Sequence, residues 1–289
     1  MEALPTDVTR PIGVFDSGIG GLTILKELRR ALPHEHLIYI GDLAHSPYGS
    51  KAPETVKRFA SQITRHLLSR KVKLIVVACN TASATAGETV RQLAAPVPVL
   101  EVVEQGAAEA LRVLEELGEE EARIGILGTE TTVTSGIYPD TIRMLADRRG
   151  IPVPAMQQQA CPLFVPLAEE GLWEGELPDM VARHYLDDMK AFQPQVVILG
   201  CTHYPLLSRT IARALPAGTR LIESAPAVVK SVKLILEEAG MAATTGEGLT
   251  EYHASDSVDT FQRLAGRFLD THLDLVHHID LDACEDREE

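Results

Sequence analysis

The sequence predicts an α/β protein with open, mainly parallel sheets. Short β-branched runs alternate with longer amphipathic stretches along most of the chain, a pattern typical of parallel strands joined by helices. The composition is that of a globular protein, with 45% hydrophobic and 24% charged residues. A length of 289 residues suffices for about two domains, each with its own core.

The expected strands are short apolar runs bounded by Gly, Pro or polar turn residues. They are residues 12–15, 37–40, 74–78, 97–103, 124–127, 196–199 and 221–222, and residues 251–254 and 273–279 are expected to complete the first sheet. Helices are expected between them. Leucines recur near helical spacing over 22–32, Pro53 stands at a helix start before an apolar stripe, and an Ala-rich stretch covers 82–93. Residues 282–289 are expected to form a charged tail.

A weak internal repeat indicates two related units. Residues 12–17 resemble residues 124–129 at an offset of 112, and residues 75–79 resemble residues 197–201 at an offset of 122. The order and local chemistry are kept while the spacing drifts, as differences in loop length would produce. Two similar α/β units are the simplest account.

Charge and cysteine usage exclude several classes of protein. The chain has 27 basic and 41 acidic residues, a net charge of −14, which argues against nucleic acid or an anionic membrane as partner. It contains neither a run of roughly 18 apolar residues nor a secretory signal, so no membrane span is expected. The cysteines at 79, 161, 201 and 284 form no ligand knuckle. We therefore expect no metal, free thiols and a reducing, cytoplasmic location.

Polar residues and two of the cysteines follow the predicted strands. In open α/β sheets, ligands bind beyond the carboxyl ends of the strands. The sequence places there Asp16, Ser17, Cys79, Asn80, Thr81, Thr129, Cys201, Thr202 and His203. This set is divided between the two units and forms the candidate site.

Paired thiols in equivalent places favour a reaction that removes a proton from one face of a carbon and returns a proton to the opposite face. Cys79 precedes a predicted helix, whose dipole is expected to lower the pKa of the thiol. Cys201 repeats the arrangement, with His203 two residues away. A single nucleophile would leave the second thiol redundant, whereas a racemase or epimerase needs two opposed acid/base groups. Asp16 could serve Cys79 or bind a substrate ammonium, and His203 could serve Cys201.

The motifs indicate no cofactor. The glycine-rich loop at 18–21 lacks both the G-x-G-x-x-G pattern and the Lys-Ser/Thr ending of a P-loop. No lysine lies among the strand-end motifs, so a pyridoxal phosphate site is not expected; Lys51 and Lys73 are interpreted as solvated residues of a loop and a strand start.

Five motifs together resemble the glutamate racemases of the cofactor-independent Asp/Glu racemase family. They are FDSGIGGL (15–22), PYG (47–49), VACNTAS (77–83), CPLFVPL (161–167) and LGCTHYPLL (199–207), in order within about residues 11–225. The resemblance implies two similar, flavodoxin-like α/β domains with the active site in the cleft between them. We expect the first domain to comprise 1–103 plus 217–289 and the second 104–216. The loop at 41–45 departs from the family pattern at Leu43 and His45.

The resemblance also implies roles for individual residues. Cys79 and Cys201 match the catalytic thiols, the first linked to D-glutamate and the second to L-glutamate, and Asp16 and His203 match the residues that assist them. The residues matching substrate contacts are Asp16, Ser17, Tyr48, Gly49, Asn80, Thr81, Thr129, Thr132, Glu169, Thr202 and His203. Glu170 is the alternative to Glu169 as the site carboxylate. Cys161 is assigned to packing.

The activity implied is interconversion of L- and D-glutamate, an isomerase reaction that supplies D-glutamate for peptidoglycan and hence for cell-wall biogenesis and cell shape. The family commonly forms homodimers. Other readings of the residues stay open: an aspartate or hydantoin racemase, a cysteine hydrolase or thiol redox enzyme, or a non-catalytic amino-acid-binding module.

Overall fold

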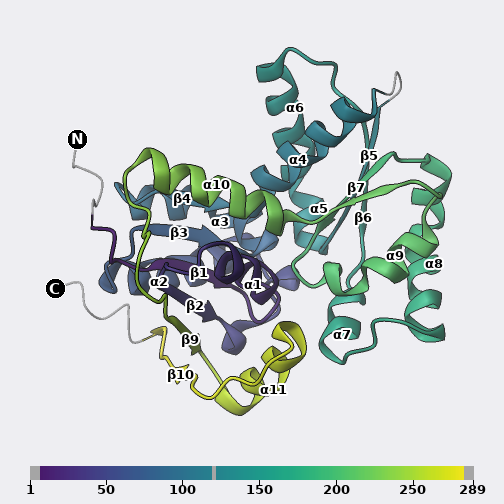
Figure 1. The fold of residues 1–289 in the computed structure, drawn as a ribbon. Helices are drawn as coiled ribbons and strands as arrows, with labels where there is room; N and C mark the ends of the chain where they lie inside the picture. Colours follow the sequence, from purple (N-terminus) through teal and green to yellow (C-terminus); the bar gives the residue numbers. More distant parts are fainter. Residues whose placement is uncertain (1–6, 119–121, 283–289) are drawn as a thin grey trace. The chain divides into compact units, whose positions relative to one another are not determined.

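The computed structural model describes residues 7–118 and 122–282 and divides into two compact units (Figure 1). Unit 1 comprises Met1–Val102 and Val228–Glu289, and unit 2 comprises Val103–Ala227. The return to the first unit therefore lies at 228, later than the expected 217, because a strand at 220–222 pairs within the second sheet. Cys284 and residues 283–289 of the expected tail lie outside the described residues.

Unit 1 contains a six-stranded sheet in the order β10-β9-β2-β1-β3-β4, and its pairings are parallel. The strands are β1 (Ile12–Asp16), β2 (Leu37–Gly41), β3 (Leu74–Val77), β4 (Val99–Glu101), β9 (Thr250–Ala254) and β10 (His277–His278). The helices are α1 (Leu22–Ala31), α2 (Pro53–Ser69), α3 (Asn80–Ala94) and α11 (Val258–Leu269), with most of α10 (Ser224–Glu238).

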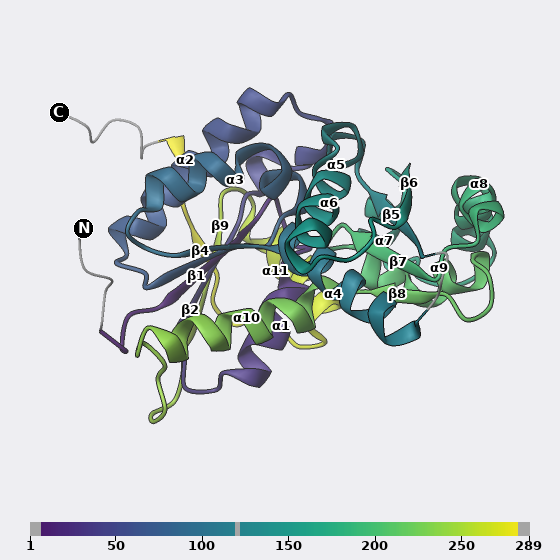
Figure 2. The ribbon, with the colours of Figure 1, turned by 90° about the horizontal axis from the view of Figure 1, so that it is seen from above.

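Helices cover both faces of this sheet, which explains its continuous apolar strands. Seen from above, α2 and α3 lie on one face and α1 and α10 on the other (Figure 2). Phe15 of β1 and Val77 of β3 pack with Phe59 and Leu67 of α2 in one buried cluster. Because β1 and β3 are buried on both faces, they read as apolar runs without polar alternation.

Unit 2 contains a four-stranded parallel sheet in the order β6-β5-β7-β8. The strands are β5 (Arg123–Gly128), β6 (Ala155–Ala160), β7 (Val196–Gly200) and β8 (Arg220–Ile222). The helices are α4 (Val102–Leu117), α5 (Glu130–Ser135), α6 (Ile137–Arg149), α7 (Phe164–Glu169), α8 (Glu176–Phe192) and α9 (Ser208–Ala214).

The strand pairing reproduces the sequence repeat. Ile12 of β1 pairs with Leu74 of β3, and Ile124 of β5 pairs with Val196 of β7. These partners differ by the same offsets, 112 and 122, that relate the repeated motifs. In unit 1, the four neighbouring strands β2, β1, β3 and β4 therefore correspond to β6, β5, β7 and β8, which make up the whole sheet of unit 2.

Three strand predictions need correction. No strand was expected at β6, where Gln157, Gln158 and Gln159 make a half-buried edge strand look like a polar loop. The run at 97–103 is a strand only at Val99–Glu101, because α4 begins at Val102. The run at 273–279 pairs only at His277–His278.

Lys73 was expected in solvent, but it is fully buried. Its Nζ lies 2.6 Å from Oε2 of Glu35 and donates to the carbonyl oxygens of Val8 and Met241, each at 2.7 Å. Glu35 in turn accepts a hydrogen bond from the backbone N–H of Ala243 at 2.7 Å. This ion pair joins segments far apart in the sequence at the amino ends of the strands, so the expectation of a solvated lysine is wrong.

We expect acidification to destabilise unit 1 through His253. Burial lowers the pKa of His253 to about 4, from an ordinary 6.5, and the Arg70 cation adds to this. Between these values the unfolded chain binds a proton that the folded unit does not, so the stability present above about pH 6.5 is lost as the pH falls toward 4. After allowance for solvent screening, the loss is on the order of 1 kcal/mol.

Urea unfolding followed by circular dichroism at about pH 7.5 and about pH 4.5 measures this effect. His253→Gln should flatten the dependence on pH, whereas His278→Gln, at an exposed histidine of β10, is the matched control. An equal pH dependence in His253→Gln and the unaltered protein would contradict the assignment.

Candidate active site

Unit 1 gathers its candidate residues at the carboxyl ends of β1, β2 and β3. Asp16 ends β1, Cys79 follows β3 by two residues, and a 3₁₀ turn at Tyr48–Ser50 follows β2. The predicted residues in this unit are Asp16, Ser17, Tyr48, Gly49, Cys79, Asn80 and Thr81. Parallel strands bring these short loops to one edge, which explains why residues so distant in sequence share it.

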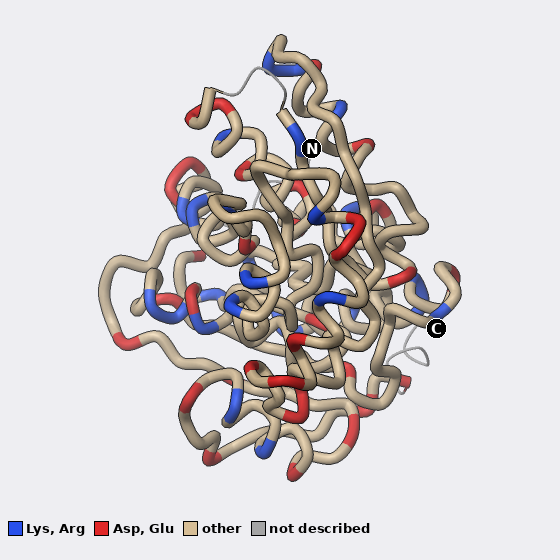
Figure 3. Tube along the Cα trace, turned by 90° about the vertical axis from the view of Figure 1, so that its right-hand side faces the viewer, with Lys and Arg blue, Asp and Glu red and all other residues tan. Residues whose placement is uncertain are grey.

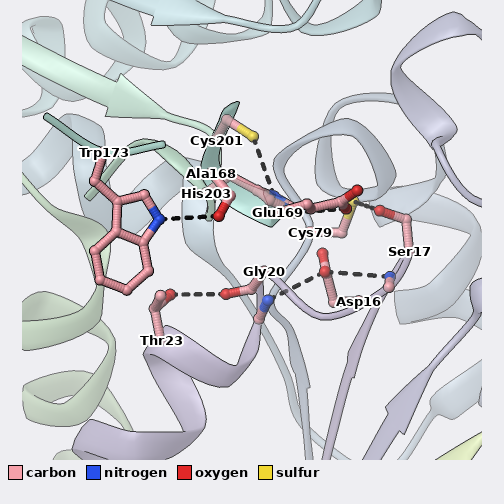
Figure 4. Close-up of polar contacts among 12 residues, drawn as sticks. Asp16, Ser17, Gly20, Thr23, Cys79, Ala168, Glu169, Trp173, Cys201 and His203 are labelled. Carbon is pink, nitrogen blue, oxygen red and sulfur yellow. Dashed lines mark hydrogen bonds and ion pairs between the residues drawn. The ribbon is translucent and has the colours of Figure 1, made fainter. Parts of the chain in front are cut away.

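Cys79 caps the start of α3. Its Sγ accepts the backbone N–H of Ala82 at 3.4 Å and lies 3.6 Å from Oγ of Ser17 (Figure 4). The expectation of a lowered thiol pKa is wrong. Burial raises the pKa of Cys79 and the negative charge of Asp16 raises it further, which outweighs the hydrogen bonds from Ala82 and Ser17. Cys79 is therefore held as a thiol.

The two carboxylate oxygens of Asp16 differ in their hydrogen bonding. Oδ2 accepts backbone N–H groups of Gly18 at 3.3 Å and Gly21 at 3.1 Å. Oδ1 is buried and has no hydrogen-bond partner among the described residues. A Cβ at position 21 would lie 2.7 Å from that of Asp16, so glycine is needed for this close approach. A buried acceptor without a donor is costly, and an ammonium group or a thiol would satisfy it.

Unit 2 places its candidate residues at the carboxyl end of its own sheet. Thr129 follows β5 and caps α5, and its Oγ1 accepts the N–H of Thr132 at 3.2 Å. Cys201, Thr202 and His203 follow β7 directly, and Glu169 ends α7. The predicted residues in this unit are Thr129, Thr132, Glu169, Cys201, Thr202 and His203.

Cys201, His203 and Glu169 form a chain of polar contacts. His203 Nδ1 lies 3.8 Å from Sγ of Cys201, and Nε2 lies 3.1 Å from Oε1 of Glu169 (Figure 4). Burial lowers the pKa of His203, but hydrogen bonds to Cys201 and Glu169 and their negative charges raise it to about 10. His203 is thus a cation at neutral pH that can donate to both partners.

Two aromatic residues that were not predicted as site residues hold this chain of contacts in place. The indole N–H of Trp173 donates to the carbonyl of Ala168 at 2.9 Å, at the end of α7 that carries Glu169. The hydroxyl of Tyr204 lies 2.9 Å from the carbonyl oxygens of Gly128 and Cys161. The sequence carried one signal, Tyr204 within the LGCTHYPLL motif, but its bonding partners are 76 and 43 residues away.

Replacing Glu169 with Gln should lower the pKa of His203 from about 10 by about 1–3 pH units, because it removes the neighbouring negative charge. Titration of the His203 ring nitrogens by NMR measures the change. Glu170→Gln is the matched control, since Glu170 is exposed at the next position. A His203 titration unmoved by Glu169→Gln would show that the carboxylate does not sustain the cation.

A cavity of about 460 Å³ lies away from these residues. It is lined by Leu111, Arg123, Val153 and Ala155 among others, at the amino ends of β5 and β6. We assign the site from the strand-end chemistry instead, because this cavity contains none of the candidate polar groups. Among residues 7–118 and 122–282, no group of three or more His, Cys, Asp or Glu is arranged to hold a metal ion.

The chain carries a net charge of −14. Basic and acidic residues are interspersed along the trace (Figure 3). Several arginines pair with acidic residues of their own helix, such as Arg112 with Glu109 and Arg143 with Asp140. In the described part of the chain, no helix is both long and apolar enough to span a membrane.

The sequence matches a known protein family. The sequence model of the Asp/Glu/Hydantoin racemase family matches residues 12–232. The chain belongs to this family.

Within the family, this chain is similar to several glutamate racemases. Those of Geobacter metallireducens and Thermus thermophilus are each 42% identical, covering 95% and 96% of this chain and 98% of either relative. The Francisella tularensis glutamate racemase, solved in complex with D-glutamate, has a TM-score of 0.86 at 34% identity, over 96% of this chain and 99% of that one. A Picrophilus torridus aspartate racemase, 14% identical with a TM-score of 0.54 over 80% of this chain and 94% of its own, shares the fold.

Proposed function

We propose that this protein is a glutamate racemase that interconverts L- and D-glutamate without a cofactor. The observation that carries the proposal is the repeated position of the two thiols. Cys79 follows β3, which pairs with β1, the first strand of unit 1. Cys201 follows β7, which pairs with β5, the first strand of unit 2, and the two cysteines stand at corresponding positions in these pairings. Glutamate is favoured over aspartate because the relatives at 42% identity are glutamate racemases, whereas the aspartate racemase is only 14% identical.

In the proposed mechanism, one thiol acts on each side of the substrate α-carbon. The thiolate of one cysteine takes the α-proton, and the thiol of the other donates a proton to the opposite face. The bond to hydrogen breaks on one side and forms on the other, so the configuration inverts. Exclusion of water and stabilisation of the carbanionic charge supply most of the barrier reduction.

The surroundings of the two thiols differ, which supports a division of roles between them. The His203 cation lies beside Cys201, whereas Cys79 is buried next to the negative charge of Asp16. We assign Cys201 as the base and Cys79 as the acid when L-glutamate is the substrate. For D-glutamate the roles reverse.

Local groups hold the substrate despite the acidic chain. The open Oδ1 of Asp16 accepts the substrate ammonium. Backbone N–H groups and hydroxyls at the helix starts hold the two carboxylates. The groups assigned to this role belong to Ser17, Gly49, Asn80, Thr81, Thr129, Thr132 and Thr202. The Tyr48 side chain is buried, so Tyr48 contributes its main chain.

The remaining proposals concern the cellular setting. The product D-glutamate supplies peptidoglycan synthesis, the protein acts in the cytoplasm, and two copies form a homodimer. Analytical ultracentrifugation with and without glutamate tests the dimer, and a monomer under both conditions would contradict it.

Incubation of L-glutamate with the protein in D2O tests the proposed function. We expect D-glutamate to form with deuterium at the α-carbon, because the incoming proton comes from a thiol exchanged with solvent. Binding of glutamate without exchange of its α-proton would indicate an amino-acid-binding module. Exchange of the α-proton of aspartate alone would indicate an aspartate racemase. Absence of racemisation and of α-deuterium with every amino acid tried would overturn a two-base mechanism.

A further inference from the structure

Asp42 is a fully buried carboxylate one residue beyond β2 and is not among the predicted site residues. Its Oδ2 accepts the hydroxyl of Tyr48 at 2.5 Å, and its Oδ1 accepts Oγ–H of Ser255 at 2.6 Å. Nδ1 of His45 lies 3.0 Å from both oxygens. The three side chains converge on one carboxylate, which compensates for the cost of burying its charge.

The backbone of Asp42 adjoins the candidate site directly. Its N–H donates to the carbonyl oxygen of Asp16 at 3.1 Å. A Cβ on the preceding Gly41 would lie 2.4 Å from the carbonyl oxygen of Gly18, so the β2 end and the loop after β1 are in close contact. Any displacement of Asp42 is therefore transmitted to the loop that carries Asp16.

The Tyr48 hydroxyl is committed to Asp42 and remains protonated. Burial raises the pKa of Tyr48, and the negative charge of Asp42 raises it further. With its ring buried and its hydroxyl fixed, Tyr48 presents only its main chain, together with that of Gly49, toward the strand ends. The carboxylate thus determines where this turn sits.

Three further contacts hold the segment from Gly41 to Tyr48 in place. Ser255 follows β9, accepts the N–H of Ala44 at 3.0 Å and donates its own N–H to Gly41 at 3.2 Å. The His45 ring stacks on Phe59 of α2, with centroids 3.8 Å apart and planes at 17°. Ser255 lies outside residues 12–232 that match the family, and His45 is a departure from the family's usual loop.

We propose that Asp42 is a positioning residue for substrate binding: together with Ser255 and His45 it fixes the Tyr48–Gly49 main chain against which a substrate carboxylate is held. The inference rests on the proposed racemase function and adds a determinant of substrate affinity to it. Asp42 does not touch the reacting atoms. Its loss should therefore weaken glutamate binding more than it slows the turnover of bound glutamate.

Asp42→Ala, Asp42→Asn, Tyr48→Phe and Ser255→Ala test the proposal through KM, kcat and calorimetric glutamate affinity. We expect Asp42→Ala to raise KM and Kd about tenfold, equivalent to about 1.4 kcal/mol, with a smaller change in kcat. Asn keeps one acceptor oxygen, so Asp42→Asn should recover part of the affinity. Asp42→Asn combined with Tyr48→Phe should cost less than the sum of the two, because both remove the same contact.

Thr64→Val is the matched control for a loss of stability alone. Thr64 is buried in α2 and donates to the carbonyl of Ala60, so its loss should lower stability and leave KM unchanged. If Asp42→Ala does not fold, Tyr48→Phe and Ser255→Ala carry the test. Folded variants with unchanged KM and Kd, in a background that racemises glutamate, would overturn the inference. Failure of the unaltered protein to racemise any glutamate would instead overturn the proposed function.

Discussion

Replacing either Cys79 or Cys201 with alanine is expected to reduce glutamate racemisation by on the order of 10²–10⁴-fold, the range that one acid/base group contributes. Inversion needs a base on one face of the α-carbon and an acid on the other, so neither thiol can substitute for its counterpart. Each variant should still fold, because a cysteine-to-alanine change removes only one small side chain. Circular dichroism and the rate of D-glutamate formation measure the two properties.

Solvent exchange distinguishes the two cysteine variants. Cys201→Ala should retain exchange of the α-proton of D-glutamate in D2O without inversion, because Cys79 can remove and return a proton on its own face. Cys79→Ala should show the reverse preference, for L-glutamate. Cys161→Ala is the matched control, a buried thiol of unit 2 assigned to packing, and should keep nearly full turnover. Full racemisation by either Cys79→Ala or Cys201→Ala would overturn the two-base mechanism, because one of the two thiols would then be dispensable.

Replacing Lys73 with Met is expected to lower the free energy of unfolding of unit 1 by about 3–5 kcal/mol. The change leaves the Glu35 carboxylate buried without its counter-ion and frees two carbonyl oxygens, those of Val8 and Met241. Urea unfolding followed by circular dichroism gives the shift in midpoint. Trp173, the only tryptophan, lies in unit 2, so its fluorescence reports separately on that unit.

The double variant Lys73→Met with Glu35→Gln separates the charge from packing. Gln removes the unpaired charge but can still accept the N–H of Ala243, so the double variant should be more stable than Lys73→Met alone. Arg30→Met is the control, because the Arg30–Glu27 pair is exposed and should contribute little. A shift in Lys73→Met no larger than in the control would mean that the buried pair does not stabilise unit 1.

Many of the strands could be predicted because the sequence patterns that mark them are local. The apolar runs of β1, β3, β5 and β7 and the repeated motifs required no knowledge of distant partners. The same local patterns placed Cys79 and Cys201 after their strands. The edge strand β6 was missed because partial burial allows glutamines there, so the apolar pattern is absent.

By itself, the sequence determined the α/β class, the two repeated units and the cysteines that follow corresponding strands. These features depend on the periodicity and order of residues that are close together in the sequence. Only the tertiary structure decided the burial of Lys73, the raised pKa of Cys79 and the bonding of Asp42. Each depends on neighbours distant along the chain: Glu35 for Lys73, Asp16 for Cys79, and Ser255, 213 residues away, for Asp42. Burial and electrostatic environment arise from such long-range contacts, which local sequence does not specify.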